Sequence, residues 1–249
     1  MALLELDGLT RRFGGIVAVD GVTMRVAAGE VRAVIGPNGA GKSTLFNLIT
    51  GVIKPTTGTV RFDEHTLTGL SAYSVCQRGI SRTFQITALF AEMTARENVR
   101  LSAQARHARR WLPWGGGAVF ADAETLADAA LERLGLAHVA QRPAGFLSHG
   151  DQRLLEVAMA LAQEPRLLLL DEPTQGLSVE ETEQAVETLS ALLADGSMTV
   201  LLVEHDMEVV FRLAQKITVM HRGSVIADDV PSVVKDDAAV QAAYLGGYA

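Results

Sequence analysis

Cysteine is almost missing from this chain of 249 residues, and its one cysteine, Cys76, has no second cysteine with which to form an internal disulfide. That usage fits a reducing compartment, and we expect Cys76 to be a small, partly buried residue. The chain also lacks an apolar run of the roughly 18–20 residues that a membrane-spanning helix needs. Its first residues show no charged segment followed by a long apolar core. We therefore expect a cytosolic protein, or one that binds a membrane only through a partner.

Positive charge is in deficit, because 22 lysines and arginines face 29 aspartates and glutamates, for a net charge of −7. Nonspecific binding of nucleic acid needs a basic field, so this balance argues against it. The seven prolines are scattered and mark no linker. Hydrophobic residues make up 48% of the chain and charged residues 20%, as in ordinary globular proteins. The length allows one large α/β domain or two small ones.

The most informative stretch matches the P-loop pattern G-x-x-x-x-G-K-[ST] at each fixed position. An apolar, β-branched segment over 30–35 precedes it, and residues 44–49 open a helix. Strand, glycine turn and helix start form an anion cradle, because backbone N–H groups and the positive end of the helix dipole converge there. The sequence therefore predicts a nucleotide-phosphate site built from Gly36, Pro37, Asn38, Gly39, Ala40, Gly41, Lys42, Ser43 and Thr44.

Residues within this loop suit different tasks. Its glycines allow the turn and a close approach of the backbone to phosphate. Lys42 can reach the β- and γ-phosphates of ATP, and the Ser43 hydroxyl can take a coordination place on Mg²⁺. The alternative, a glycine-rich turn that matches by chance, is disfavoured by the strand before the loop and the helix after it.

A run of four leucines over 167–170 predicts a strand buried on both faces. It ends in Asp171 and Glu172, and ligands of open α/β sheets bind at the carboxyl ends of such strands. Asp171 is thus predicted to hold Mg²⁺ through water, and Glu172 to orient or deprotonate the water that attacks a γ-phosphate. The structural alternative is a plain strand-end turn before Pro173.

Two further sites are predicted from their position. The buried strand over 199–203 leads to His205, whose imidazole can donate a hydrogen bond to a γ-phosphate. Ser148 is a good N-cap for the helix that follows it, and Gly150 leaves backbone amides open. This helix start is therefore a second predicted anion site.

The rest of the sequence predicts antiparallel strands early in the chain, followed by a parallel α/β core, and hence a mixed sheet. In the first part of the chain, single strands are expected over 3–9 and 60–63, a strand pair over 16–26, and turns at 10–15 and 56–58. Further on, we expect a short strand over 80–85, one helix that begins at 94, another over 121–136, and a hairpin over 217–227. Phe13, in the first turn, is placed either to stack on a nucleobase or to pack in the core.

Five arginines and two tryptophans follow the helix start at 94, among them Arg96 and Arg100. Interleaved basic and aromatic residues can bind nucleic acid, lipid headgroups or an acidic partner loop. The alternative is a solvated helix face with a local insertion loop. The sequence does not assign a role to this insertion over 100–117.

The P-loop, the helix start at Ser148 and Gly150, the leucine strand ending in Asp171 and Glu172, and the strand-end His205 occur in the order and spacing of ATP-binding cassette (ABC) ATPases. The chain resembles that family over essentially its whole length. The resemblance implies an α/β P-loop fold with a mixed central sheet, an antiparallel β subdomain and a helical signature subdomain. It implies one domain over 1–249, with the helical subdomain inserted at about 86–163.

The same resemblance implies roles for individual residues. Phe13 corresponds to the aromatic residue that stacks on adenine, and Gln85 to the amide that senses Mg²⁺ and the attacking water. Ser148 and Gly150 belong to the signature motif, which in this family meets the γ-phosphate held by the other subunit. Glu172 corresponds to the catalytic carboxylate and His205 to the switch histidine, with Lys42 from the P-loop. With one P-loop and one signature per chain, a head-to-tail dimer enclosing two MgATP is implied.

The signature motif departs from the family pattern Leu-Ser-Gly-Gly-Gln. Here His149 replaces a glycine and Asp151 replaces the glutamine, while Ser148 and Gly150 are kept. The charge of Asp151 is expected either to weaken ATP affinity or to be neutralised by Arg153.

Finer similarities connect the chain to ATPases of bacterial branched-chain amino acid importers and of the related urea and amide importers; they include Arg82-Thr83-Phe84-Gln85, Glu97-Asn98-Val99, Val203-Glu204-His205-Asp206-Met207 and the ending Tyr244-Leu245-Gly246. This resemblance implies two transmembrane permease subunits, a periplasmic solute-binding protein reached indirectly, and a place on the cytoplasmic face of the cell membrane. The alternative is a soluble ABC ATPase that serves as an assembly or nucleic-acid-associated factor. Such proteins commonly carry a second cassette, a long coiled-coil insertion or a basic tail, none of which occurs here.

Overall fold

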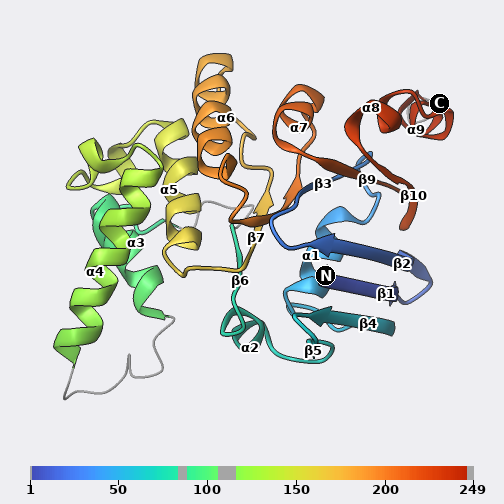
Figure 1. Ribbon diagram of the computed structural model, residues 1–249, viewed down its shortest axis with the longest axis horizontal. Coiled ribbons are helices and arrows are strands. Elements are labelled where there is room, and N and C mark those ends of the chain that lie inside the picture. Colours follow the sequence, from blue (N-terminus) through green and yellow to red (C-terminus); the bar gives the residue numbers. More distant parts are fainter. Residues whose placement is uncertain (1, 84–88, 106–115, 246–249) are drawn as a thin grey trace. The chain divides into compact units, whose positions relative to one another are not determined.

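The computed structural model describes residues 2–83, 89–105 and 116–245. The chain divides into two compact units, of which the first consists of Met1–Arg78 with Gly196–Ala249 and the second of Gly79–Asp195. No helix in the described parts is both long and apolar enough to cross a membrane. Figure 1 labels the elements of both units, which are described one at a time below.

The first unit contains an antiparallel sheet with the strand order β2-β1-β4-β5 (Figure 1). Its strands are β1 (Ala2–Phe13), β2 (Ile16–Ala27), β4 (Thr57–Phe62) and β5 (His65–Thr66). The predicted turns at 10–15 and 56–58 are wrong in extent, and 16–26 is one strand instead of a pair. Gly14 turns the chain at φ 58°, so Phe13 still pairs with Ile16 and the whole turn shrinks to two glycines.

The predicted mixed sheet is present in the first unit. There β3 (Val31–Ile35) pairs in parallel with β8 (Thr199–Val203) and with β9 (Lys216–His221), while β10 (Ser224–Asp229) pairs antiparallel with β9. Every residue of β3 and β8 is buried, as expected for parallel strands covered on both faces. The predicted hairpin is confirmed, and both residues of its turn, Arg222 and Gly223, have positive φ.

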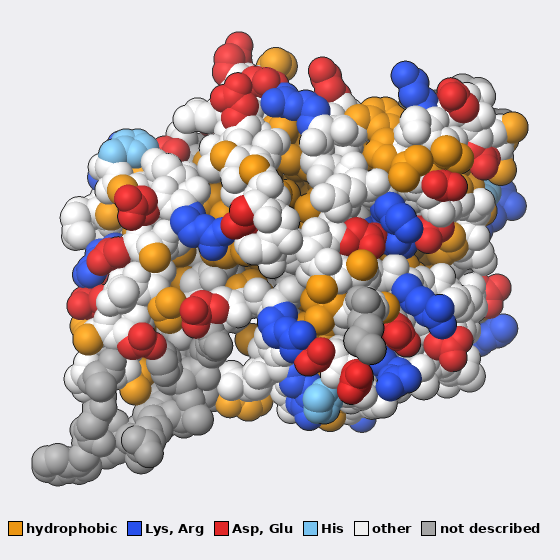
Figure 2. Space-filling model, viewed as in Figure 1, with side chains coloured by type: hydrophobic (Ala, Val, Ile, Leu, Met, Phe, Trp, Pro, Cys, Tyr) orange, Lys and Arg blue, Asp and Glu red, His pale blue; other side chains and the backbone are white. Residues whose placement is uncertain are grey.

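Five helices complete the described part of the first unit: α1 (Lys42–Ile49), α2 (Ala72–Cys76), α7 (Met207–Leu213), α8 (Pro231–Lys235) and α9 (Ala238–Leu245). Cys76, at the end of α2, is half-buried, as the sequence predicted. Hydrophobic side chains gather on the surface between α7 and α8 (Figure 2). Phe211 of α7, and Val230 and Val233 at the start of α8, are exposed hydrophobic residues.

The second unit pairs β6 (Ile80–Arg82) in parallel with β7 (Leu167–Asp171). Its helices are α3 (Ala95–Ala105), α4 (Gly116–Arg133), α5 (His149–Leu161) and α6 (Val179–Leu193), with short 3-10 turns at Ala137–Val139 and Ala144–Phe146. The helix predicted over 121–136 instead spans Gly116–Arg133, so it begins five residues and ends three residues earlier than predicted. Residues 84 and 85 of the strand predicted over 80–85 lie outside the described residues.

The arginines of α3 make internal contacts. Arg96 donates to both carboxylate oxygens of Asp128 at 2.6 and 2.8 Å and to Glu124 at 3.1 Å. The hydrogen bond with Asp128 is the main reason that the pKa of Arg96 is raised. Arg100 lies over the ring of Phe120, 4.3 Å from its centroid. These contacts tie α3 to α4, so Arg96 and Arg100 do not form a free basic patch; the other three arginines and both tryptophans lie outside the described residues.

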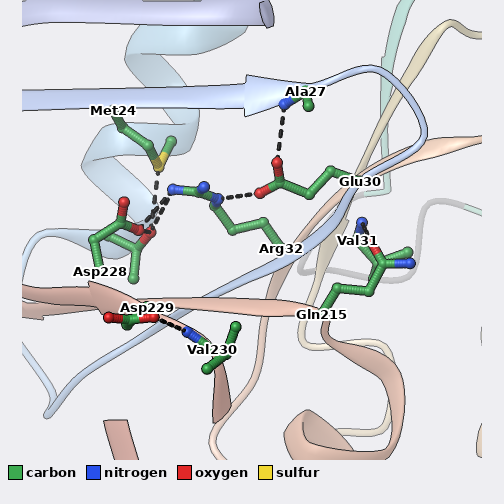
Figure 3. A network of polar contacts seen from close by, with 10 residues as sticks. Met24, Ala27, Glu30, Val31, Arg32, Gln215, Asp228, Asp229 and Val230 are labelled. Carbon is green, nitrogen blue, oxygen red and sulfur yellow. Dashed lines mark hydrogen bonds and ion pairs between the residues drawn. The ribbon is translucent and has the colours of Figure 1, made fainter. Parts of the chain in front are cut away.

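A buried arginine connects the strands around β3 (Figure 3). Arg32 is 1% exposed, and its Nε donates to Glu30 at 2.6 Å while Nη1 donates to Asp228 on β10 at 2.6 Å and to Thr218 on β9 at 3.2 Å. Glu30 also accepts the backbone N–H of Ala27 at 3.0 Å. A buried guanidinium is tolerated only when its donors are satisfied. This network therefore fixes β3 to β2, β9 and β10 by polar contacts as well as by the sheet.

The network predicts the effect of removing one carboxylate. Glu30→Ala leaves the Arg32 guanidinium buried with fewer acceptors, which should lower the free energy of unfolding by about 3 kcal/mol. Urea unfolding measures this loss. Glu187→Ala, at an exposed position on α6, is the control and should change stability by less than about 0.5 kcal/mol. Equal stability of the two variants would mean that the network contributes nothing measurable.

Candidate nucleotide-binding site

The P-loop of the first unit connects β3 to α1, and its glycines are required for different reasons. A Cβ on Gly36 (φ 150°) would lie 2.1 Å from the carbonyl oxygen of Met220, and one on Gly41 (φ 104°) would lie 2.3 Å from that of Ala18. Gly39 has φ 79° but open space around it. Gly36 and Gly41 therefore allow β9 and β2 to pack closely against the loop, while Gly39 is needed only for its backbone conformation.

Lys42 is buried and lies over the P-loop. Its Nζ donates to the carbonyl oxygens of Gly36 at 2.6 Å and Pro37 at 3.2 Å. Ser43, beside it, is exposed in the first turn of α1, and no side chain caps this helix start. The loop thus presents an ammonium group, a hydroxyl and uncapped amides, which together suit a phosphate group.

Two other predicted residues of the first unit follow the ends of strands. Val34 of β3 pairs with Val203 of β8, so His205 and the P-loop both follow strands that end at one edge of the sheet. His205 is exposed, and its backbone N–H donates to the buried Glu204 carboxylate at 2.9 Å. Phe13 ends β1 with a ring that is 44% exposed, which excludes the core-packing alternative. The Arg11 guanidinium lies 4.5 Å from the ring centroid.

Asp171 ends β7 in the second unit and is 1% exposed. Its Oδ2 accepts from Arg82 at 2.6 Å, and its backbone N–H donates to the Thr83 hydroxyl at 3.1 Å. Its other oxygen, Oδ1, is buried and has no hydrogen-bond partner among the described residues. A buried carboxylate oxygen in this state fits the role of a ligand to Mg²⁺ or to a metal-bound water. Arg82 and Thr83 were not predicted as site residues.

Glu172 is buried and has the left-handed backbone conformation, with φ 52°. Such a conformation is uncommon outside glycine and concentrates at functional sites. The Glu172 carbonyl accepts the N–H of Gln175 at 3.1 Å, which closes the turn that leaves the strand. The strand-end turn that was the structural alternative is therefore present, and the Glu172 carboxylate is buried where the chain leaves β7.

The second predicted anion site is the start of α5. Ser148 is the N-cap, and its hydroxyl accepts the N–H of Asp151 at 3.1 Å. The Gly150 amide donates to Glu181 Oε1 at 3.1 Å. Glu181 also forms the capping box of α6 with Ser178, and hydrogen bonds from Ser178 and then Gly150 lower its pKa. A carboxylate thus binds the amide of the predicted anion site, although Glu181 was not predicted as part of it.

Not every predicted interaction is found. Among the described contacts, Arg153 pairs with Glu156 at 3.0 Å, so the expectation that it neutralises Asp151 is not supported. Gln85 lies outside the described residues. The P-loop and His205 belong to the first unit, and Asp171, Glu172, Ser148 and Gly150 belong to the second.

Comparisons with known proteins agree on one family. The family model described as ABC transporter matches residues 19–175. The high-affinity branched-chain amino acid transport ATP-binding protein BraF of Pseudomonas aeruginosa is 42% identical, and LivG of Escherichia coli, with the same description, is 40% identical; each match covers 98% of both chains.

Solved structures extend the likeness to the fold. An ATP-binding cassette of an ABC transporter in its ADP conformation is 32% identical and covers 99% of both chains, with a TM-score of 0.85. A dimeric cassette in a post-hydrolysis state, bound to ADP and Pi, is 28% identical, covers 92% of this chain and 98% of its own, and has a TM-score of 0.76.

The two kinds of P-loop glycine predict different costs of substitution. Gly39→Ala adds only the strain of a left-handed alanine, about 1–2 kcal/mol. Gly41→Ala adds a clash with the Ala18 carbonyl to backbone strain, and each contributes about 1–3 kcal/mol. Thermal unfolding without nucleotide should therefore show a clearly larger loss for Gly41→Ala. Equal losses would contradict the close packing of β2 on the loop.

Proposed function

Since the chain belongs to the ABC transporter family and is an ATPase of that family, we propose that it is the ATP-hydrolysing subunit of a bacterial importer for branched-chain amino acids or related small polar solutes such as urea and amides. The observation that carries this proposal is the 40–42% identity with BraF and LivG along 98% of the chain. An identity that extends beyond the nucleotide motifs supports a shared transport system more strongly than the motifs alone. The alternative of a soluble assembly or nucleic-acid-associated factor is not favoured.

In this proposal ATP lies on the P-loop with its phosphates against the amides of residues 36–44. Lys42 turns its ammonium from the loop carbonyls toward the β- and γ-phosphates, and the exposed ring of Phe13 stacks on adenine. Ser43, Asp171 and Gln85 hold Mg²⁺, with the orphaned Oδ1 of Asp171 as the supporting observation. When bound, Mg²⁺ neutralises charge on the phosphates.

Hydrolysis is assigned to Glu172, which accepts a proton from the attacking water, and to His205, which donates a hydrogen bond to the γ-phosphate. Burial of the Glu172 side chain and the fixed turn beneath it support this role, because a general base must be held in one direction. His205 is exposed and follows the strand next to β3, which supports its access to a bound phosphate.

The working unit is proposed to be a head-to-tail dimer in which Ser148 and Gly150 of each chain meet the γ-phosphate on the partner's P-loop. Two observations support it. The Gly150 amide already binds a carboxylate oxygen, so it is able to bind an anion. A solved relative in a post-hydrolysis state is dimeric and bound to ADP and Pi. Closure of the dimer on ATP, and its reopening after hydrolysis, would supply the mechanical step of transport.

The proposed partners are a second cassette, two permease subunits and, indirectly, a periplasmic solute-binding protein. The chain then lies on the cytoplasmic face of the membrane as one cassette over 1–249. Its helical subdomain at about 86–163 includes α3, α4 and α5, and the surface around residues 85–99 presses on the permease. No contact with nucleic acid is part of this function, in keeping with the net charge of −7.

The first test combines mass and turnover. Glu172→Gln removes the general base but keeps the size of the side chain, so ATP hydrolysis should fall about 10²–10⁴-fold. The variant should still bind MgATP and become a dimer, which light scattering coupled to size-exclusion chromatography detects. Glu187→Gln, an exposed change on α6, should hydrolyse ATP like the wild type. A monomeric Glu172→Gln variant with wild-type turnover would refute the assignment of the base and of the dimeric site.

The second test concerns transport. Co-production with its permease subunits should move the chain into the membrane fraction, and the chain should stay in the soluble fraction without them. Proteoliposomes with the complete transporter and its binding protein should take up labelled leucine in an ATP-dependent way, and competition by urea or an amide measures the solute range. A chain that stays in the soluble fraction beside its permease subunits would contradict the importer function.

A further inference from the structure

Two residues at the ends of neighbouring strands of the second unit form a buried ion pair. Arg82 is the last residue of β6, and Asp171 is the last residue of β7 (Figure 1). The strands are parallel, and Arg82 lies opposite Leu169. Because side chains alternate between the two faces of a strand, Leu169 and Asp171 share one face, and Arg82 is on the same one. The register of the two strands therefore brings the guanidinium to the carboxylate.

The ion pair leaves one of the two carboxylate oxygens of Asp171 without a partner. Nη2 of Arg82 donates to Oδ2 of Asp171 at 2.6 Å, and the two side chains are 14% and 0% exposed. Oδ1 is buried too, and it has no hydrogen-bond partner among the described residues. An arginine that only neutralises a carboxylate frequently binds both oxygens, since its N–H groups match them in pairs. The contact seen here secures one oxygen and keeps the other available for a cation.

Thr83, the next residue along the chain, fixes the backbone at the same point. Its hydroxyl accepts the N–H of Asp171 at 3.1 Å, and its own N–H donates to the Leu169 carbonyl at 3.0 Å. Arg82 and Thr83 thus hold the side chain and the main chain of Asp171 from one short segment. A buried carboxylate that is held at both points keeps one direction, which is what a metal ligand needs.

We propose that Arg82 is a positioning residue for Mg²⁺ binding, which holds Oδ2 of Asp171 so that Oδ1 can bind the ion or one of its waters. This inference rests on the proposed function, in which Asp171 helps to hold Mg²⁺ beside the nucleotide. It adds a basic residue of β6 to that site. The positive charge of Arg82 is balanced by the oxygen that the ion does not use, so the two cations share one carboxylate.

The test measures how much Mg²⁺ tightens the binding of ADP, which is not hydrolysed and keeps phosphates for the ion. Calorimetric titration of the full chain with ADP, once with Mg²⁺ and once with EDTA, gives two affinities, and their ratio isolates the contribution of the metal. Loss of a residue that holds a metal ligand typically lowers metal affinity about 10–100-fold. Arg82→Gln should therefore lower this ratio about 10-fold, with a ratio of one as the limit, and leave the affinity in EDTA unchanged.

Arg96→Gln is the matched control. Arg96 is an ion-paired arginine of the same unit with a side chain that is 26% exposed, but its partners Glu124 and Asp128 lie on α4. This variant loses an ion pair that does not involve Asp171, so it should keep the wild-type ratio.

A conservative variant guards against a loss of folding. Arg82→Lys keeps a single donor for Oδ2, which is all that this contact uses, and its ratio should stay within about 3-fold of the wild type. Arg82→Gln is also expected to fold, because a cavity of about 50 Å³ adjoins residue 82 and has Ser102 and Gln163 in its walls. The shorter amide side chain has room and polar neighbours there.

A double variant tests whether Arg82 acts through Asp171. Asp171→Asn removes the charged ligand and should by itself bring the ratio close to one. Adding Arg82→Gln to Asp171→Asn should then cause no further loss of MgADP affinity, because the residue that Arg82 positions has already lost its function.

Three results would overturn the proposal: the wild-type ratio in Arg82→Gln, the ratio of Asp171→Asn in Arg82→Lys, or a further loss of MgADP affinity in the double variant. A merely structural role of Arg82 would lower the melting temperature of Arg82→Gln and leave its ratio unchanged. Failure of the proposed metal site has a different signature, because the wild type and Asp171→Asn would then have the same ratio. That result would overturn both proposals together.

Discussion

The close approach of Gly36 to the Met220 carbonyl is the constraint on which the phosphate loop depends. It allows β3 to end directly beside β9 and the chain to turn at once toward α1. Arg32 fixes β3 beside β9 and β10 through its ion pairs with Glu30 and Asp228. Lys42 folds back over the turn and donates a hydrogen bond to the Gly36 carbonyl. The first turn of the loop is thereby packed against the backbone of β9 without any side chain in between.

Much of the fold was predictable because burial leaves a strong mark on the sequence. The strands β3, β7 and β8 consist mostly of β-branched residues or leucine, and every residue in them is buried, including the charged Arg32 and Asp171. The errors fall where local rules compete. Polar residues ending in Gly14-Gly15 predicted a broad turn over 10–15, yet the pairing of β1 with β2 extends to the residue before those glycines. Residues 57–58 likewise belong to β4, because pairing with β1 outweighs the weak strand preference of glycine.

The candidate site was predictable where a motif places its residues within a few positions, as in the P-loop. It was not predictable where the partner is distant in sequence. Asp171 is held by Arg82 and the Gly150 amide by Glu181, and no local pattern encodes contacts between such separated positions. The arginines of α3 show the opposite error, in which local composition predicts a site that distant contacts remove. Their composition indicated a ligand surface, but Arg96 and Arg100 are engaged with α4, whose acidic and aromatic residues are 20 or more positions away.

The hydrogen bond between Gly150 and Glu181 gives the start of α5 an anionic partner within the chain. An incoming anion has to displace a carboxylate that belongs to the same chain, and Glu181 is at once part of the cap of α6, beside Ser178. The cap of α6 uses the other oxygen of Glu181, Oε2, which accepts the Ser178 N–H at 3.0 Å. An anion that takes the Gly150 amide therefore replaces one hydrogen bond of Glu181 while the bond that caps α6 stays in place. The affinity of this helix start for an anion is thus the difference between the new contact and one already made within the chain.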